Sequence, residues 1–197
     1  MSLHIVGEKN LIFLHIPRTA GTSIADWLLS NKGNSHYAQW ETHPKLSTVL
    51  ENRIPCTSFT VVRNPWDRMI SLYFYMRNIS INKNSNWIKM NNITHNTIPS
   101  FEEWVCNIDD RLMPEEYWFK ESTPQVDWID REIDIIIRYE NLKEDFIKIQ
   151  QEFKTAIELP YLNSSGRSDY ADYYNDSTKK LVGKIFEADI DEWKYSF

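Results

Sequence analysis

Apolar residues recur along the chain in short blocks of two kinds, continuous runs and helical stripes. Continuous runs at Leu11–Leu14, Ser58–Val62 and Ile133–Ile137 predict strands that are buried on both faces. Apolar residues at helical spacing predict helices behind the first two strands, and again over 142–153 and 177–188. This alternation favours an α/β fold of three layers, α/β/α, whose central sheet is parallel and binds ligands at the carboxyl ends of its strands.

Polar residues at the ends of the strands mark where helices begin. Thr22 or Ser23 is expected to be the N-cap of the first helix. Asn64 followed by Pro65 at the first helical position predicts the start of the second helix. The sequence Ser100-Phe-Glu-Glu103 is a capping box, which predicts a further helix.

The length of 197 residues suits a single domain over residues 1–197. An Asn-rich stretch at about 78–100 has little apolar periodicity, and we expect a lid, an acceptor-binding insertion or a disordered loop. No apolar run approaches the roughly 20 residues of a membrane-spanning helix, and the N-terminal residues do not resemble a signal peptide. We therefore expect a soluble, cytoplasmic protein in which Cys56 and Cys106 are reduced.

The loop after the first strand has the composition of an anion-binding site. It joins a strand to a helix, an arrangement that directs backbone N–H groups and a positive dipole end toward an anion. Arg18 supplies a permanent charge, and the hydroxyl groups of Thr19, Thr22 and Ser23 supply further donors. The alternative is an ordinary turn in which Arg18 pairs with a carboxylate. The net charge of −6 argues against a nucleic-acid surface, so an anionic ligand must be held locally.

The same loop departs from the P-loop motif G-x-x-x-x-G-K-[ST] of nucleoside triphosphatases. His15 stands at the position of the first Gly, Ala20 precedes Gly21, and no Lys follows. Since the hydroxyl after that Lys holds magnesium in those proteins, we expect no metal here. These departures weaken the case for a nucleotide-dependent kinase.

A second charged residue, Arg63, stands at the end of the second strand. Arg63 and Ser71 in the following helix are expected to converge on a second anion. The alternative is that Arg63 pairs with Asp67 and that Ser71 is a small packing residue. A later loop rich in turn-forming residues has Gly166 and Arg167 at its tip.

Several segments together resemble the P-loop-fold sulfotransferases that use 3′-phosphoadenosine 5′-phosphosulfate (PAPS), in particular the carbohydrate-type branch. HIPRTAGTS resembles the family's 5′-phosphosulfate loop, H-I-P-K-T-G-G-T-S. TVVRNPWDRMISLYFY resembles its 3′-phosphate segment, V-R-[DN]-P-x-x-R-x-x-S-x-Y. IIIRYENLKEDF and the closing segment from LPYLNSSGRSDY onward resemble its later parts, so the likeness covers most of the chain.

This resemblance implies transfer of the sulfuryl group from PAPS to a hydroxyl of a carbohydrate or similar small-molecule acceptor, with release of the product PAP. On the grounds of charge and short apolar runs given above, we expect no nucleic-acid partner and no membrane span. The sequence does not predict the oligomeric state. Arg18 replaces the usual Lys and Ala20 a common Gly. The residues implied to bind the nucleotide are Arg18, Thr19, Ala20, Gly21, Thr22 and Ser23 at the 5′-phosphosulfate, Arg63 and Ser71 at the 3′-phosphate, and Asn163 and Arg167 in a closing loop.

An acceptor hydroxyl also needs a base. His43 stands between the two phosphate motifs, where the carbohydrate-type branch often carries a His, and His36 is the alternative. His15 is expected to position the loop. Arg18 and His43 are therefore the expected catalytic residues. Two other functions stay open, a kinase that uses magnesium and ATP and a nucleotide-binding module without activity.

Overall fold

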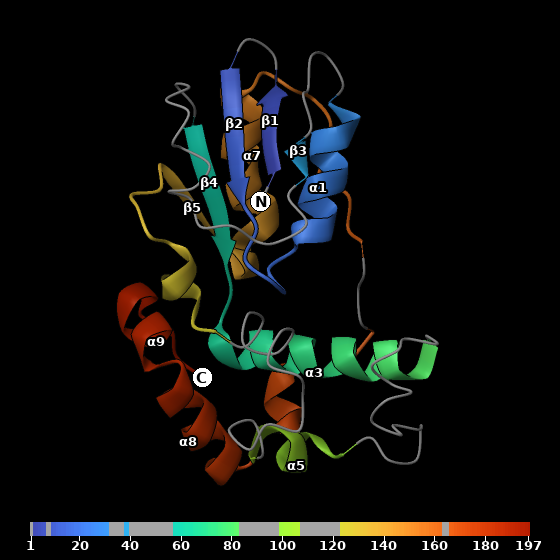
Figure 1. Cartoon of the computed structure of the whole chain (residues 1–197), viewed down its shortest axis with the longest axis vertical. Helices are drawn as coiled ribbons and strands as arrows, with labels where there is room; N and C mark the ends of the chain where they lie inside the picture. Colours follow the sequence, from blue (N-terminus) through green and yellow to red (C-terminus); the bar gives the residue numbers. More distant parts are fainter. Residues whose placement is uncertain are drawn as a thin grey trace. The chain divides into compact units, whose positions relative to one another are not determined.

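The computed structural model describes residues 2–6, 9–31, 38–39, 57–82, 99–106, 123–162 and 166–197 (Figure 1). These residues fall into two compact units. Unit 1 comprises Met1–Arg63 and Pro124–Ser164, and unit 2 comprises Asn64–Thr123 and Ser165–Phe197. The predicted phosphosulfate loop belongs to unit 1, whereas Arg167 belongs to unit 2.

Unit 1 is built on a five-stranded sheet with the strand order β3-β1-β2-β4-β5. Its central strands β2, β4 and β5 are parallel, with Phe59 of β4 opposite Phe13 on one side and Ile135 on the other. The predicted α/β class with parallel central strands is therefore confirmed. Strands β1 and β3 are antiparallel and were not predicted, because their short sequences lack the continuous apolar run of a strand buried on both faces. The strands are β1 (Ser2–Val6), β2 (Lys9–Leu14), β3 (Ala38–Gln39), β4 (Thr57–Val62) and β5 (Ile135–Arg138).

The core of unit 1 lies between one face of this sheet and the helices α1 (Gly21–Ser30) and α7 (Leu142–Glu152). The Phe13 and Phe59 rings of neighbouring strands stack with their centroids 4.9 Å apart. Trp27 of α1 meets Phe146 of α7 edge to face at 4.8 Å, so both helices cover the same face (Figure 1). The sequence predicted helices on both faces of the sheet. Among the described residues of unit 1, helices cover one face.

A carboxylate joins β4 to the segment before β5. Asp134 Oδ2 accepts hydrogen bonds from the backbone N–H and the hydroxyl of Ser58, at 2.7 and 2.6 Å. Asp134 N in turn donates to Ser58 Oγ at 3.1 Å. These Ser58 donors hold the pKa of the Asp134 carboxyl below its usual value of 3.8.

We expect Asp134→Asn to lower the free energy of unfolding by about 1 kcal/mol near neutral pH, a value reduced because the carboxyl is exposed. Because the folded-state pKa is lowered, the contribution is complete above the unfolded-state pKa and is lost as the pH falls through the folded-state pKa. Urea unfolding between pH 3 and pH 7 measures this. If the difference in unfolding free energy between wild type and variant stays constant below about pH 4, the stabilising role of the Asp134 carboxylate is contradicted.

Unit 2 is helical, and its helices begin where the sequence predicts. Asn64 Oδ1 accepts from Trp66 N at 3.0 Å, so Asn64 caps the helix that begins at Pro65. The predicted capping box is also confirmed, since the Ser100 N–H and hydroxyl both donate to Glu103 Oε2 at 2.8 Å. The predicted helix over 177–188 is instead two helices that meet at Phe186. The elements are α3 (Pro65–Asn82), α5 (Phe101–Cys106), η3 (Tyr170–Tyr173), α8 (Asp176–Ile185) and α9 (Glu187–Trp193).

Helix α3 continues to Asn82, so the loop expected from residue 78 begins later than predicted. A helix that is already nucleated gains one hydrogen bond for each residue added, and this offsets the weak helix propensity of Asn. Residues 83–98 lie outside the described residues, and the lid there stays a prediction. Cys106 is an exposed free thiol, whereas Cys56 lies outside the described residues.

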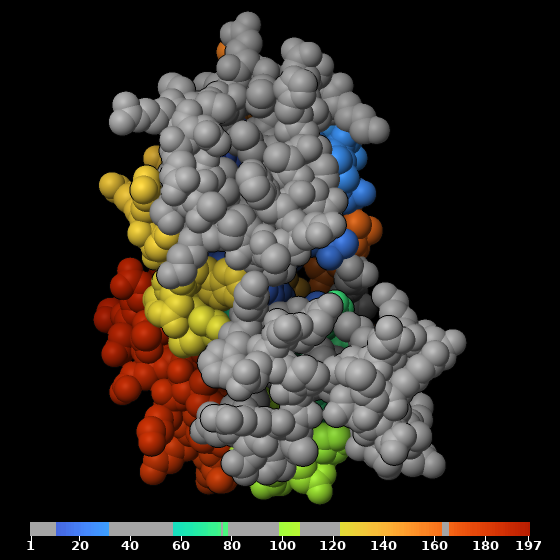
Figure 2. Space-filling model, viewed as in Figure 1, coloured from blue at the N-terminus to red at the C-terminus, as the bar shows by residue number. Residues whose placement is uncertain are grey.

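The last residues of the chain pack against the start of α3. Phe197 meets the ring of Trp66 edge to face at 5.6 Å, and the Lys179 ammonium lies 4.0 Å from the Phe197 ring centroid. Asn64 Nδ2 donates to Ser196 O at 2.9 Å. Figure 2 shows the surface of α8 and α9 in red. Lys180 of α8 is exposed. Among the described residues, no helix combines the length and the apolar character needed to cross a membrane.

Candidate functional site

The loop between β2 and α1 has an unusual backbone. Arg18 and Ala20 both lie in the left-handed region, with φ values of 69° and 71°, and the φ of Thr19 between them is negative. Successive N–H groups in a turn that contains left-handed residues can point to one side and form a concave anion-binding surface. The loop leads directly into the N-terminus of α1, where the helix dipole favours negative charge. Its backbone is therefore suited to an oxyanion.

The predicted N-cap of α1 at Thr22 or Ser23 is wrong. Helix α1 begins at Gly21, and its N-cap is Ala20, whose side chain forms no capping hydrogen bond. The left-handed turn at Ala20 already ends the loop, which moves Thr22 and Ser23 into the first helical turn. Because a methyl group cannot accept a hydrogen bond, the first-turn N–H groups are not capped by the N-cap side chain.

Gly21 is needed where the loop meets the helix, because the His15 ring occupies the space of a side chain. A Cβ atom at Gly21 would lie 1.8 Å from His15 Nε2. On its other side, the His15 ring stacks on Phe13 with the centroids 5.7 Å apart. These contacts agree with the prediction that His15 positions the loop.

The hydroxyl groups of the loop differ in what they contact. Thr19 is fully buried, and its Oγ1 donates to Ile16 O at 2.7 Å, so this hydroxyl stabilises the loop itself. Ser23 Oγ accepts from Leu162 N at 3.1 Å, and its own proton can be donated to an anion. Thr22 is exposed. The chain that leads into residue 163 is thus held beside the loop.

Ala20→Gly is expected to raise the free energy of unfolding by about 0.5–1 kcal/mol. A left-handed residue with a Cβ is strained by roughly 1–2 kcal/mol, and Gly relieves this strain. Part of the relief is offset because Gly has more conformational freedom in the unfolded chain. The matched control is Ala25→Gly in the interior of α1, which is expected to lower the same free energy by about 1 kcal/mol. Chemical denaturation of both variants measures the difference. Two shifts of the same sign contradict the left-handed assignment.

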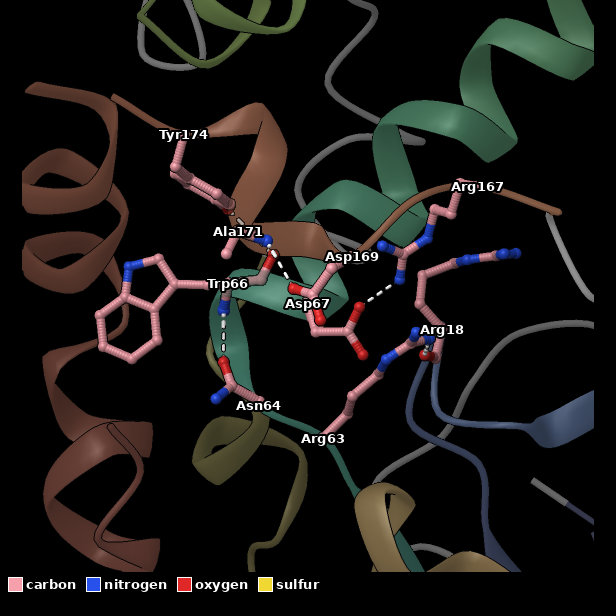
Figure 3. A network of polar contacts seen from close by, with 9 residues as sticks. All are labelled: Arg18, Arg63, Asn64, Trp66, Asp67, Arg167, Asp169, Ala171 and Tyr174. Atoms are coloured by element: carbon pink, nitrogen blue, oxygen red, sulfur yellow. Dashed lines mark hydrogen bonds and ion pairs between the residues drawn. The ribbon is translucent and has the colours of Figure 1, made fainter. Parts of the chain in front are cut away.

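Arg63 is held in place at the end of β4 and is only 6% exposed. Its Nη1 donates to the carbonyl oxygen of Arg18 at 3.0 Å (Figure 3), and its guanidinium carbon lies 3.8 Å from the centroid of the Tyr139 ring. The Gln125 side chain accepts from Arg63 N at 2.9 Å and donates to Arg63 O at 2.8 Å. These contacts fix the guanidinium and connect it directly to the left-handed loop. Unit 1 therefore concentrates two arginines at the carboxyl ends of its parallel strands.

In unit 2, the remaining predicted side chains lie on or against α3. Arg167 Nη2 forms an ion pair with Asp67 Oδ1, and the two side chains are only 10% and 14% exposed (Figure 3). Asp67 is thus a partner of Arg167. Ser71 is 8% exposed and lies one helical turn after Asp67. Tyr174 donates its hydroxyl to Trp66 O at 2.9 Å, and burial, with a further contribution from the Asp67 charge, raises the pKa of that phenol.

Three predicted residues, His43, His36 and Asn163, lie outside the described residues, so their roles stay predictions. Tyr139 and Gln125, which hold Arg63, were not singled out from the sequence. Tyr139 lies in RYENL, a segment of the family resemblance, whereas nothing in the sequence around Gln125 distinguishes it. In the part of the chain that the structure describes, no group of three or more His, Cys, Asp or Glu side chains could hold a metal ion.

Taken together, the parallel strands and the left-handed loop define an α/β protein with a candidate anion site in a strand–loop–helix segment. The sequence matches the family model of the Sulfotransferase family over residues 2–196, and the chain belongs to this family. Its general chemistry is therefore the transfer of a sulfuryl group. The crystal structure of mouse sulfotransferase SULT7A1 complexed with PAP has the same fold, with a TM-score of 0.53, 13% identity, and coverage of 91% of this chain and 84% of that chain. A comparison with curated proteins gave no significant match.

Proposed function

We propose that the protein transfers the sulfuryl group of PAPS to a hydroxyl of a carbohydrate or similar small-molecule acceptor and releases PAP. The observation that carries the proposal is the loop of unit 1, where Arg18 and Ala20 are left-handed and Arg63 holds the Arg18 carbonyl. Such a loop suits the 5′-phosphosulfate of the donor. The mouse sulfotransferase of the same fold was crystallised with PAP, which supports this choice of nucleotide.

In this proposal the loop binds the group that is transferred. The backbone N–H groups of residues 18–23 and the hydroxyl of Ser23 donate to the 5′-phosphosulfate, and Arg18 places a positive charge beside the bridging oxygen. Arg18 cannot donate a proton, since the guanidinium of an arginine stays protonated in proteins. It therefore stabilises the leaving phosphate as a fixed charge and not as an acid.

Arg63 and Ser71 bind the 3′-phosphate in this proposal. The Tyr139 ring fixes the plane of the Arg63 guanidinium before the ligand arrives, which reduces the ordering cost of binding. Because Arg63 Nη1 also holds the Arg18 carbonyl, we expect truncation of Arg63 to disturb both ends of the nucleotide. Arg63 alone therefore cannot distinguish the 3′-phosphate from the 5′-phosphosulfate.

The proposed reaction is an in-line displacement at sulfur. The acceptor oxygen forms a bond to sulfur while the bond from sulfur to the bridging phosphate oxygen breaks, and PAP leaves with that electron pair. The acceptor proton passes to His43, the proposed general base. Arg18 supplies the positive charge that the departing phosphate oxygen needs, so the proposal includes no metal.

Two measurements test this function. PAP at 100-fold excess over its dissociation constant is expected to stabilise the protein by about 2.7 kcal/mol, whereas Mg-ATP at the same concentration gives a far smaller shift. Incubation with PAPS and a panel of hydroxylated acceptors is expected to add one sulfate to an acceptor, which mass spectrometry detects. Stabilisation by Mg-ATP alone favours a kinase. Binding of PAP without turnover of any acceptor favours an inactive nucleotide-binding module.

A further inference from the structure

We infer that Asp67 is a positioning residue, which holds Arg167 on the face of α3 where the 3′-phosphate of the nucleotide binds. This inference rests on the proposed function. The ion pair between the Arg167 guanidinium and the Asp67 carboxylate joins two segments that are 100 residues apart in the chain. Figure 3 shows the pair, and both side chains are almost buried, so the guanidinium is confined by its surroundings as well as by the carboxylate.

The position of Asp67 on α3 directs Arg167 toward Ser71. Residues four apart on a helix lie on the same face with their Cβ atoms about 5–6 Å apart. Asp67 and Ser71 have this spacing within α3 (Pro65–Asn82). By holding Arg167, Asp67 therefore brings a cation to the helix face that carries Ser71, the residue proposed to bind the 3′-phosphate.

A guanidinium suits this task because it can contact two anions at once. Arg167 has five N–H donors in a planar fork, and the bond to Asp67 is made by Nη2. The other edge of such a fork can meet a phosphate while the first edge keeps its carboxylate. Arg167 follows Gly166, whose φ of 56° lies in the left-handed region. The backbone alone does not define where a side chain as long as that of Arg167 lies. Asp67 supplies that definition and lowers the entropy lost on binding.

The test is a double-mutant cycle with two ligands that differ in one group. Isothermal titration measures PAP and adenosine 5′-phosphate, which lacks only the 3′-phosphate, on the wild type, Asp67→Ala, Arg167→Ala and the double variant. We expect each single variant to lose about tenfold or more in PAP affinity with little change for adenosine 5′-phosphate. If Asp67 acts through Arg167, the double variant binds PAP no more weakly than Arg167→Ala.

Two further variants keep the cycle interpretable. Asp67→Asn keeps the size of the side chain and one hydrogen-bond acceptor, and we expect a smaller loss that is again restricted to PAP. If Asp67→Ala does not fold, this variant carries the test. Asp145→Ala breaks the exposed Lys148–Asp145 pair, which lies on α7, and is expected to change neither affinity.

Unchanged or tighter binding of PAP by the Asp67 variants overturns the inference. So does an equal loss for both ligands, which indicates a merely structural role, or a loss in the double variant that adds to the loss in Arg167→Ala. If Arg167→Ala loses PAP affinity and the Asp67 variants do not, the inference about Asp67 fails while the proposed function stands. If the wild type shows no preference for PAP over adenosine 5′-phosphate, the proposed function fails first.

Discussion

Arg18→Ala is expected to lower the turnover of PAPS on the order of 10²-fold or more, while its effect on PAP affinity is much smaller. The negative charge of the bridging oxygen develops in the transition state, so a cation aimed at this oxygen stabilises the transition state more than the bound product. Turnover is measured as sulfate added to the acceptor at saturating PAPS, and PAP affinity by titration. Equal losses in both quantities contradict a transition-state role, and unchanged turnover contradicts the assignment of the loop.

The backbone of the loop makes this comparison cleaner than most alanine substitutions. Arg63 contacts the carbonyl oxygen of Arg18, which every variant at this position retains. Ala and Lys both carry a Cβ, so both experience the left-handed φ of 69° much as Arg does. We therefore expect Arg18→Lys, which keeps the charge, to retain much of the activity. An Arg18→Lys variant as inactive as Arg18→Ala indicates that the fork geometry is needed as well as the charge.

The features that the sequence predicted correctly have local causes. The buried strands follow from continuous apolar runs, and the start of α3 from Asn64 before Pro65, whose cap the structure contains. The start of α1 was predicted wrongly because Thr22 is a better capping residue than Ala20 by side-chain chemistry alone. The left-handed backbone at Ala20 places the start of α1 at Gly21. The His15 ring packs against Gly21 at this point, and the local sequence does not predict such a tertiary contact.

The site was predictable as a set of charges but not as a set of contacts. Arg18 and Arg63 stand out because each follows a buried strand, and parallel strands bring such ends together. Their partners lie far along the chain, as Gln125 does for Arg63, 62 residues away. Asp67 likewise forms an ion pair with Arg167, which lies 100 residues further along the chain. Spacing along the sequence predicts ion pairs within one helix. Ion pairs between distant segments depend on how those segments pack together.

His43→Ala is expected to reduce turnover by roughly 10²- to 10⁴-fold with PAP affinity nearly unchanged. An acceptor hydroxyl is a poor nucleophile near neutral pH, and an imidazole with an ordinary pKa of about 6.5 is well matched to removing its proton. His43 does not belong to the motifs proposed to bind the nucleotide, so its loss should leave titration with PAP unaffected. His36→Ala, the matched control, is expected to keep most of the wild-type turnover.

The pH dependence of turnover gives an independent test of the same base. The neutral form of a His is the one that accepts a proton, so the wild-type rate is expected to rise with pH through an ionisation near pH 6.5. In His43→Ala we expect this rise of the rate with pH to disappear, because the group that produces it has been removed. If His43→Ala stays active while His36→Ala is inactive and its residual turnover no longer rises with pH, His36 is the base. If turnover still rises with pH in both variants, the proton goes to another group and the role of His43 is refuted.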